Sequence, residues 1–324
     1  MNIPRWVYVV LIIAGAIFLT CAACVYAHAL FLGHSRNWEP DGRAQNDQAI
    51  GVRTLYVTVL DKTGKPISDL KHEDFSVRQN GVPQQVLDAL PASATPLVIG
   101  VMVDVSGSRD AEGYRQQNLQ VLSKFFASTV KDSEEAFVVS FGTSCRPMTD
   151  ITNSVAALQA ALGQIGNEHP HGQTALYDCL YEVADLMAQE QTRRKAILVF
   201  SDFWDTSSHR SLEDAILHAQ NIGTAVFVFF NPQKDLPGPL VRDLQLTPAH
   251  QATRETGGMG YGFESPSGLE SSLMHMQHLL ENSYALKYRM RDNPQKGGRV
   301  KIKIEVRRKD TTVIASERLP SAIP

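Results

Sequence analysis

The stretch VIGVMVDVSGSRD, residues 98–110, is apolar over its first six positions and then places Asp104, Ser106 and Ser108 in alternation. A short apolar run that ends in turn-forming residues is typical of a strand buried on both faces of a sheet. Three oxygen-bearing side chains in one tight loop can point toward a common centre, which suits Mg²⁺ with its demand for about six oxygen ligands. These residues alone leave a second interpretation open, in which Asp104 caps the next helix and the serines serve the turn.

The pattern around this stretch alternates buried strands with helical segments. Apolar strands are predicted at 97–103, 135–142, 196–201 and 224–230, and helices near 111–131, 153–165, 174–190, 210–221 and 267–283. Strands that are apolar on both faces imply a mostly parallel sheet covered by helices on both sides. The sequence therefore predicts a doubly wound α/β fold over residues 96–284.

Two smaller β-rich segments flank this region. Residues 52–92 contain an alternating strand and an Asn80-Gly81 pair, which is a strong hairpin signal. In residues 285–324, Val300 and Ile302 alternate with Lys301 and other charged residues, which indicates a strand with one apolar and one solvated face. The chain has 324 residues, a length that suggests two compact units.

The first 33 residues predict a membrane anchor or a signal sequence. No charged residue occurs between Trp6 and Gly33, and the run exceeds the roughly 20 apolar residues that span a bilayer. Its length favours an uncleaved anchor, although Ala27-His28-Ala29 would serve as a cleavage site and leave a secreted or periplasmic protein. Residues 34–51 are polar and form a linker. No second such apolar run occurs in the sequence, so we expect the rest of the chain to lie outside the cytoplasm.

Charge argues against a nucleic-acid partner. The formal net charge is −3, which gives no field strong enough to attract polyanions. The basic residues near the C-terminus are interpreted as a solvated strand face.

Two further segments bring polar side chains to the edge where Asp104 is predicted. Thr174 begins a helix after a glycine-containing loop, while Asp202 and Asp205 follow the buried strand AILVFS. Ligands of open parallel sheets bind at the carboxyl ends of the strands, where these residues would meet. The additional hydroxyl and carboxylate favour a metal site over a simple helix cap.

The D-x-S-x-S, Thr, Asp pattern of the metal-ion-dependent adhesion site is matched by Asp104, Ser106, Ser108, Thr174 and Asp202. Through this pattern, residues 96–284 resemble von Willebrand factor A (VWFA) domains. With VLDKTGKPISDL before this region and SYALKYRM after it, most of residues 52–318 resemble the bacterial VWFA-related proteins of acidobacterial type.

The resemblance implies a division of roles among these residues. Ser106 and Ser108 would bind the ion directly, Thr174 directly or through water, and Asp104 and Asp202 largely through water. One coordination position would stay open for an Asp or Glu carboxylate from a protein or peptide partner. The implied ion is Mg²⁺, with Mn²⁺ or Ca²⁺ as alternatives.

The predicted function is metal-dependent protein binding on an extracytoplasmic, membrane-anchored protein, with no enzyme activity. Two charged ligands do not saturate a divalent ion, so a partner's carboxylate gains attraction there. A Mg²⁺-dependent hydrolase is the first alternative, but such an enzyme would need a second carboxylate where Ser106 stands, and no G-x-S-x-G elbow is present. A structural domain that never holds metal is the second alternative.

The sequence departs from the family pattern beside the site. Phe203 and Trp204 follow Asp202 where a glycine is common, and we expect these aromatics to shape the ligand surface. Arg109 follows the motif and is expected to pair with Asp202 or Asp205.

The remaining candidates carry less chemistry. Of the four cysteines, Cys21 and Cys24 lie in the apolar N-terminal run, and Cys145 and Cys179 are predicted to be unpaired, although an oxidising compartment would permit a disulfide. The loop histidines, His169, His171 and His209, match no zinc-ligand spacing. The glycines of residues 257–262 lack nucleotide-binding spacing and predict a flexible turn.

Overall fold

The fold is that of a computed structural model, which describes residues 51–106, 114–131, 133–169, 172–231, 239–290 and 299–320. Contacts divide the chain into two compact units, 1–45 and 46–324, and every described residue lies in the second. Within the described ranges, none of the helices has the length and apolarity needed to cross a bilayer. The predicted anchor, 1–33, and the linker as far as residue 50 lie outside the described residues.

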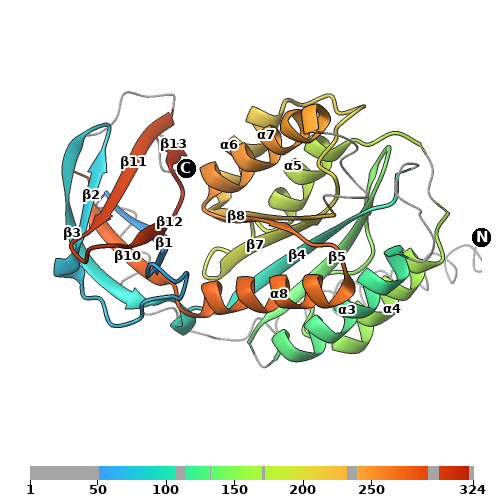
Figure 1. Cartoon of the computed structure of the whole chain (residues 1–324), viewed down its shortest axis with the longest axis horizontal. Coiled ribbons are helices and arrows are strands. Elements are labelled where there is room, and N and C mark those ends of the chain that lie inside the picture. The colour runs from blue at the N-terminus through green and yellow to red at the C-terminus, as the bar shows by residue number, and fades with distance from the viewer. Residues whose placement is uncertain are drawn as a thin grey trace, which may run out of the picture. The chain divides into compact units, whose positions relative to one another are not determined.

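A six-stranded, mostly parallel sheet forms the centre of the second unit (Figure 1). Its strand order is β6-β5-β4-β7-β8-β9, and only β6 runs antiparallel to its neighbour. The strands are β4 (Leu97–Asp104), β5 (Glu135–Phe141), β6 (Cys145–Pro147), β7 (Arg194–Phe200), β8 (Thr224–Phe230) and β9 (Gly260–Gly262). This topology confirms the predicted doubly wound α/β fold.

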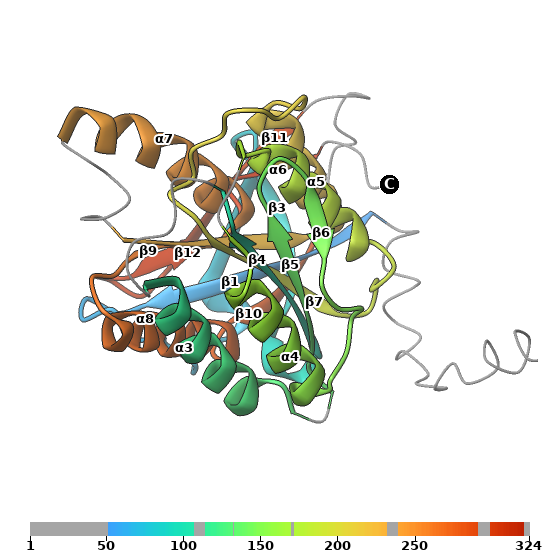
Figure 2. The same cartoon turned by 90° about the vertical axis from the view of Figure 1, so that its right-hand side faces the viewer.

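Helices cover both faces of this sheet (Figures 1 and 2). One face carries α3 (Tyr114–Thr129), α4 (Val155–Gly166) and α8 (Pro266–Glu281), and the other carries α5 (Leu176–Leu186), α6 (Leu212–Ile222) and α7 (Pro239–Thr256). Alternate residues of β4 enter the two cores, with Ile99 and Val101 on the α3 side and Val98 and Met102 on the α5 side. A strand buried on both faces explains the apolar run in the sequence.

Among the α-helices of the described residues, five of six agree with the predicted ranges to within a few residues at each described end. The sequence does not predict α7, because Pro248 lies inside it and its apolar residues follow no clear helical period.

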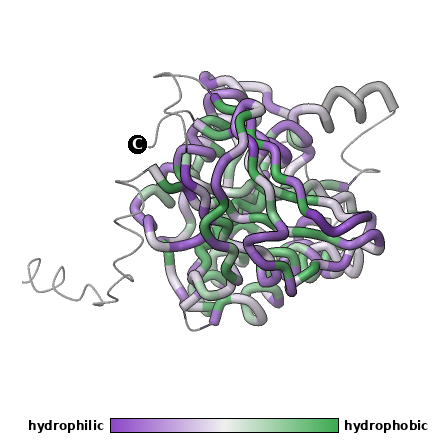
Figure 3. The backbone as a smooth tube through the Cα atoms, turned by 90° about the vertical axis from the view of Figure 1, so that its left-hand side faces the viewer, coloured by the Kyte–Doolittle hydropathy of each residue, from purple (hydrophilic) through white to green (hydrophobic). Residues whose placement is uncertain are grey.

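The β-rich ranges before and after the parallel sheet combine into one antiparallel sheet. Its strand order is β12-β1-β10-β3-β2-β11-β13. The strands are β1 (Val52–Leu60), β2 (Phe75–Gln79), β3 (Val82–Pro91), β10 (Tyr284–Arg289), β11 (Arg299–Val306), β12 (Thr312–Ile314) and β13 (Arg318–Pro320), with short 3₁₀ helices η2 (His72–Asp74) and η3 (Ala92–Ala94) beside them. Hydrophobic and hydrophilic residues alternate along these strands (Figure 3), and the apolar side chains form a third core.

Local signals in the flanking ranges are confirmed. Asn80 and Gly81 have φ of 49° and 83° and connect β2 to β3, as a hairpin turn of this composition requires. In β11, Val300 and Ile302 are buried while Lys301 is exposed.

The prediction that Cys145 and Cys179 are unpaired is wrong, because the structure joins them in a disulfide between β6 and α5. Their Cα atoms lie 5.0 Å apart although 34 positions separate them in the sequence. The pairing follows from the packing of an edge strand against a helix, which sequence spacing does not reveal.

The glycines before β9 pack closely against other parts of the chain. A Cβ atom at Gly258 would lie 1.9 Å from the Val226 carbonyl oxygen, and Gly257, at φ 84°, approaches the Ser316 backbone. These contacts, rather than the predicted flexibility of a turn, explain why residues without a Cβ stand here.

Candidate metal centre

The predicted site lies where the strand order of the parallel sheet reverses. The chain passes from β4 to β5 on one side and later to β7 on the other side of β4 (Figure 1). Ligands of doubly wound folds bind at such switch points, beyond the carboxyl ends of the strands. Val103 pairs with Phe200, so the residues that follow β4 and β7 leave the sheet side by side.

Asp104 is the last residue of β4 and is 3% exposed. Its Oδ1 accepts a hydrogen bond of 2.9 Å from the Ser106 backbone N–H, and its Oδ2 accepts one of 2.6 Å from the Ser201 hydroxyl. Val105 and Ser106 are not helical, so Asp104 is not the residue that directly precedes helix α3. The turn interpretation is partly right, because Asp104 organises the backbone of residues 104–106.

Ser106 carries an unsatisfied polar atom. The residue is 2% exposed, and its Oγ is fully buried without a hydrogen-bond partner among the described residues. An unpartnered buried hydroxyl costs about 1–3 kcal/mol, so such groups are rare in native proteins unless a water, ion or ligand completes them. The Ser106 backbone N–H is bonded to Asp104, so the residue lies at the end of β4, where ligands of this fold bind.

Asp202 follows β7 and meets Asp104 through a shared neighbour. The Ser201 Oγ lies 2.6 Å from Asp104 Oδ2 and 3.5 Å from Asp202 Oδ1, so one hydroxyl is close to both carboxylates. Ser201 is fully buried and also accepts a 3.1 Å hydrogen bond from the Phe203 N–H. Ser201 was not among the site residues predicted from the sequence. Its position between an apolar strand and Asp202 was the one feature that could have indicated a role at the site.

Thr174 is held against the loop that follows β7. Its N–H donates to Thr206 Oγ1 at 2.8 Å, and its carbonyl accepts from the N–H groups of Thr206 and Ser207 at 2.9 and 3.1 Å. Thr174 is 6% exposed. The backbone of Thr174 is thus fixed by the same loop that carries Asp202, which brings these two predicted ligands onto one rigid unit.

Asp205 and Asp178 lock this loop to the start of α5. Asp205 Oδ1 accepts from the N–H groups of Leu176 and Tyr177 at 2.8 and 3.3 Å, which caps a helix whose N-cap residue, Ala175, has no acceptor side chain. In return, Asp178 of α5 accepts hydrogen bonds from the backbone N–H groups at residues 209 and 210, each of 2.9 Å.

The charge state of Asp178 follows from these contacts. Desolvation acts to raise the pKa of its carboxyl group, but the hydrogen bonds from the backbones and side chains of His209 and Arg210 outweigh it and lower the pKa from 3.8 to about 2. The carboxylate therefore stays charged at neutral pH and continues to accept these bonds.

The two aromatic residues after Asp202 have different environments. Phe203 is 2% exposed, has φ of 61°, and its ring centroid lies 6.5 Å from that of Tyr177. The expectation that Phe203 shapes the ligand surface is therefore wrong, since its ring belongs to the core. Trp204 is 46% exposed, and its backbone N–H donates a 3.0 Å hydrogen bond to Asp202 Oδ1.

Several predicted participants lie outside the described residues. Ser108 and Arg109 are among them, so the third ligand of the motif and the expected Arg109 ion pairs stay predictions, as does any role of His171. In the described part of the chain, no three His, Cys, Asp or Glu side chains come together as a metal site. The predicted ligand set differs from such a cluster because three of its five members are hydroxyls.

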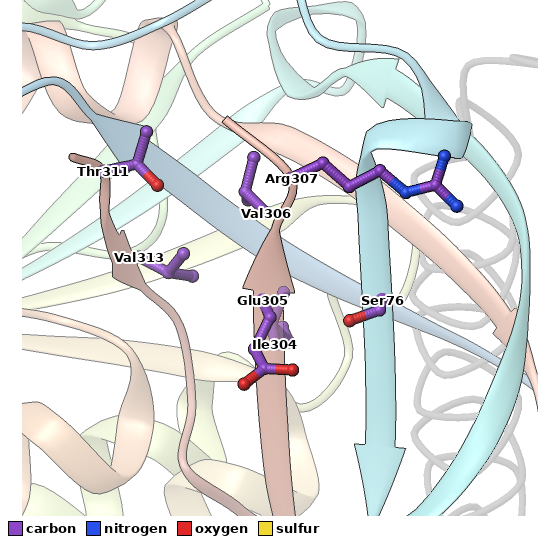
Figure 4. Close-up of a pocket in the computed structure, with 7 residues that line it drawn as sticks. All are labelled: Ser76, Ile304, Glu305, Val306, Arg307, Thr311 and Val313. Carbon is purple, nitrogen blue, oxygen red and sulfur yellow. The ribbon is translucent and has the colours of Figure 1, made fainter. Parts of the chain in front are cut away.

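A separate hollow of about 650 Å³ lies on the antiparallel sheet (Figure 4). The residues that line it are Ser76, Ile304, Glu305, Val306, Arg307, Thr311 and Val313. The Arg307 guanidinium points away from the other labelled side chains (Figure 4). None of the predicted metal ligands lines this hollow.

The class that the fold and the site define is a doubly wound domain with oxygen-bearing side chains at its switch point. Residues 99–204 match the family model of the von Willebrand factor type A domain, and the chain contains such a domain. Domains of this class typically mediate protein interaction or adhesion and are generally not enzymes. No curated protein matches the chain.

Solved structures with a similar fold come from several organisms. A von Willebrand factor type A protein from Catenulispora acidiphila is 15% identical over 82% of this chain and 74% of its own, with a TM-score of 0.45. Proximal thread matrix protein 1 from the mussel byssus, solved with a zinc-occupied MIDAS motif, is 18% identical over 62% and 49%, with a TM-score of 0.49. An aerotolerance-related membrane protein from Bacteroides fragilis is 13% identical over 56% and 98%, with a TM-score of 0.44.

Proposed function

We propose that this chain binds a protein or peptide partner through a divalent cation, Mg²⁺ in the first instance, held at the switch point between β4 and β7. The ligand set is Asp104, Ser106, Ser108, Thr174 and Asp202. The partner supplies an Asp or Glu carboxylate to the remaining coordination position. The proposed activity is binding, without turnover.

The observation that carries this proposal is the buried hydroxyl of Ser106, which has no hydrogen-bond partner in the part of the chain that the structure describes. The Ser106 backbone N–H donates to Asp104, and the Asp104 and Asp202 carboxylates share the Ser201 hydroxyl as a neighbour. A hard divalent cation would satisfy the hydroxyl and offset the charge of both carboxylates at once. Because the carboxylates neutralise the ion without giving it a net negative surrounding, an incoming carboxylate is still attracted.

The proposed location is the outer side of a membrane, with residues 1–33 as the anchor. The Cys145–Cys179 disulfide supports this location, because disulfides persist in oxidising compartments and are rare in the cytosol. If residues 1–33 are cleaved instead, the same domain is released in soluble form outside the cytoplasm.

Mn²⁺ quenching of tryptophan emission tests the metal site. Trp204 lies two positions from Asp202, and the chain has just two other tryptophans, Trp6 and Trp38. We expect saturable quenching of wild-type emission by Mn²⁺ and its reversal by excess Mg²⁺. A Trp204→Phe variant measures the emission of the other two tryptophans, which is subtracted.

Ser106→Ala is the decisive variant, because it removes one hydroxyl that makes no hydrogen bond to any residue that the structure describes. The free energy of unfolding without metal should be unchanged or slightly higher, while Mn²⁺ affinity should fall at least tenfold. Unchanged Mn²⁺ affinity in this variant, or an absence of quenching in wild type, would leave the metal-free structural domain as the better description. Turnover of a phosphoester that Asp104→Ala abolishes would instead favour the hydrolase.

A further inference from the structure

Trp204 is a large aromatic residue that the fold leaves 46% exposed at the edge of the proposed metal centre. Exposed indole surface is unfavourable in water, and tryptophan is the residue type most enriched in the energetic centres of protein interfaces. Its position next to Asp202, a proposed metal ligand, rather than its exposure alone, points to a role in partner binding.

The backbone around Trp204 is rigid and strained. Phe203 adopts φ of 61°, a conformation that costs a bulky residue about 1–2 kcal/mol, yet its ring is buried and its N–H is bonded to Ser201 Oγ. The next N–H, that of Trp204, donates to Asp202 Oδ1 at 3.0 Å. These bonds hold the backbone of Trp204 next to a proposed metal ligand, and a left-handed Phe203 turns one aromatic inward while its neighbour stays at the surface.

Rigid presentation matters for binding energy. The loop that carries Trp204 is tied to α5 by Asp205 and Asp178, so little backbone entropy is lost when a partner covers the indole. Anchors that are ordered before binding contribute more to affinity than mobile ones.

We infer that Trp204 selects a partner in which an apolar side chain stands directly next to the Asp or Glu carboxylate. The inference rests on the proposed function, because the ion fixes the carboxylate and thereby brings the adjacent side chain over the indole. A neighbouring Lys or Arg loses hydration of its charged group when it packs against the indole, whereas an aliphatic or aromatic side chain buries apolar area against Trp204 without that cost. The partner motif is thus an acidic residue flanked by an apolar one.

Bead-bound peptides of the form Gly-Xaa-Asp-Xaa-Gly, with Xaa varied, test this inference with the full chain in Mn²⁺. Wild type should enrich peptides with apolar Xaa about tenfold over those with Gly, Ser or Lys, a ratio that corresponds to about 1.4 kcal/mol. Trp204→Ala should lose this preference while still requiring the Asp, and Trp204→Phe should retain most of it.

Met274→Ala is the matched control, because Met274 is an apolar residue of α8 that is 65% exposed. This variant should select peptides as wild type does. Free Mn²⁺, measured by its electron paramagnetic resonance signal, should fall equally in all of these variants because none lacks a proposed ligand.

The outcomes separate two kinds of failure. If Mn²⁺ and Asp peptides bind but the apolar preference is absent, is replaced by a cationic one, or survives in Trp204→Ala, the inference about Trp204 is overturned while the proposed function stands. If wild type takes up no Mn²⁺, or binds Mn²⁺ but no Asp peptide, the proposed function itself fails and the inference fails with it.

Discussion

At the residue scale, the Ser201 hydroxyl sets the geometry of both carboxylates. It is fully buried, donates to Asp104 Oδ2 at 2.6 Å, and lies 3.5 Å from Asp202 Oδ1. A group that orients metal ligands without touching the ion typically changes metal affinity by about 10- to 100-fold. Ser201 is thus a positioning residue for the proposed site.

Ser201→Ala should therefore lower Mn²⁺ affinity about tenfold, as measured by quenching of Trp204 emission. The free energy of unfolding should also fall, by about 1–2 kcal/mol, because Asp104 Oδ2 and the Phe203 N–H lose a partner.

Ser211→Ala provides the comparison. Ser211 is the N-cap of α6 and accepts from the Asp214 N–H at 3.1 Å, so its loss should cost about 1 kcal/mol of stability. Since Ser211 touches neither carboxylate, Mn²⁺ affinity should not change. Equal loss of affinity in both serine variants would mean that general destabilisation, and not the orientation of Asp104, explains the effect.

The strand-end carboxylates were predictable, whereas Ser201 was not. Asp104 and Asp202 each follow a continuous apolar run, so their place at one edge of a parallel sheet could be inferred from the sequence. The role of Ser201 depends on the register that pairs Val103 with Phe200, and register between distant strands has no local sequence signal.

At the element scale, α5 is held by groups that are distant in the sequence. Its first turn is capped by Asp205, and its interior Cys179 is bonded to Cys145 of the edge strand β6. Both attachments fix the helix that begins two residues after Thr174. The apolar period predicted this helix, but the cap and the disulfide depend on which elements pack against it.

Loss of the Cys145–Cys179 bond should lower the free energy of unfolding by about 3–4 kcal/mol, because a cross-link that closes a loop of this length restricts the unfolded chain by roughly that amount. The loop spans 34 positions. Urea denaturation of wild type with and without dithiothreitol would measure the change.

A Cys145→Ala, Cys179→Ala double variant should match reduced wild type and should not respond to dithiothreitol. Both proteins should still bind Mn²⁺, because neither cysteine is a proposed ligand. If wild type gives the same unfolding midpoint in both conditions, the two cysteines are not joined in the native protein.

At the scale of the whole second unit, the antiparallel sheet unites the ranges on either side of the type A domain. Strand β10 pairs with β1 on one side and β3 on the other, so residues near 285 lie between residues near 55 and 90. Alternating apolar residues predicted the strands of both ranges. The pairing of strands from the two ranges could not be predicted from the sequence. Alternation specifies which face of a strand is buried, but not which other strand lies beside it.

This sheet contacts the type A domain through a buried ion pair. Arg299 of β11 lies 2.8 Å from Glu255 Oε2 near the end of α7, and the two side chains are 11% and 6% exposed. Arg299 also donates to the Glu213 carbonyl at 2.9 Å. A second pair, Arg254 with Glu317, joins the same two regions but is 66% and 50% exposed.

Breaking the buried pair should destabilise the protein far more than breaking the exposed one. Glu255→Leu removes the close, buried carboxylate of Arg299 and leaves the guanidinium with the Glu213 carboxylate, which lies 3.5 Å away on a side chain that is 70% exposed. This substitution should cost about 3 kcal/mol, whereas Glu317→Ala should cost less than about 1 kcal/mol. Adding Arg299→Met to Glu255→Leu should recover most of the loss, since an apolar pair needs no charge compensation. Urea denaturation of the single and double variants gives the coupling energy of the pair. Additive losses at positions 255 and 299 would contradict a direct interaction, because only a shared contact makes the second substitution cheaper once the first has been made.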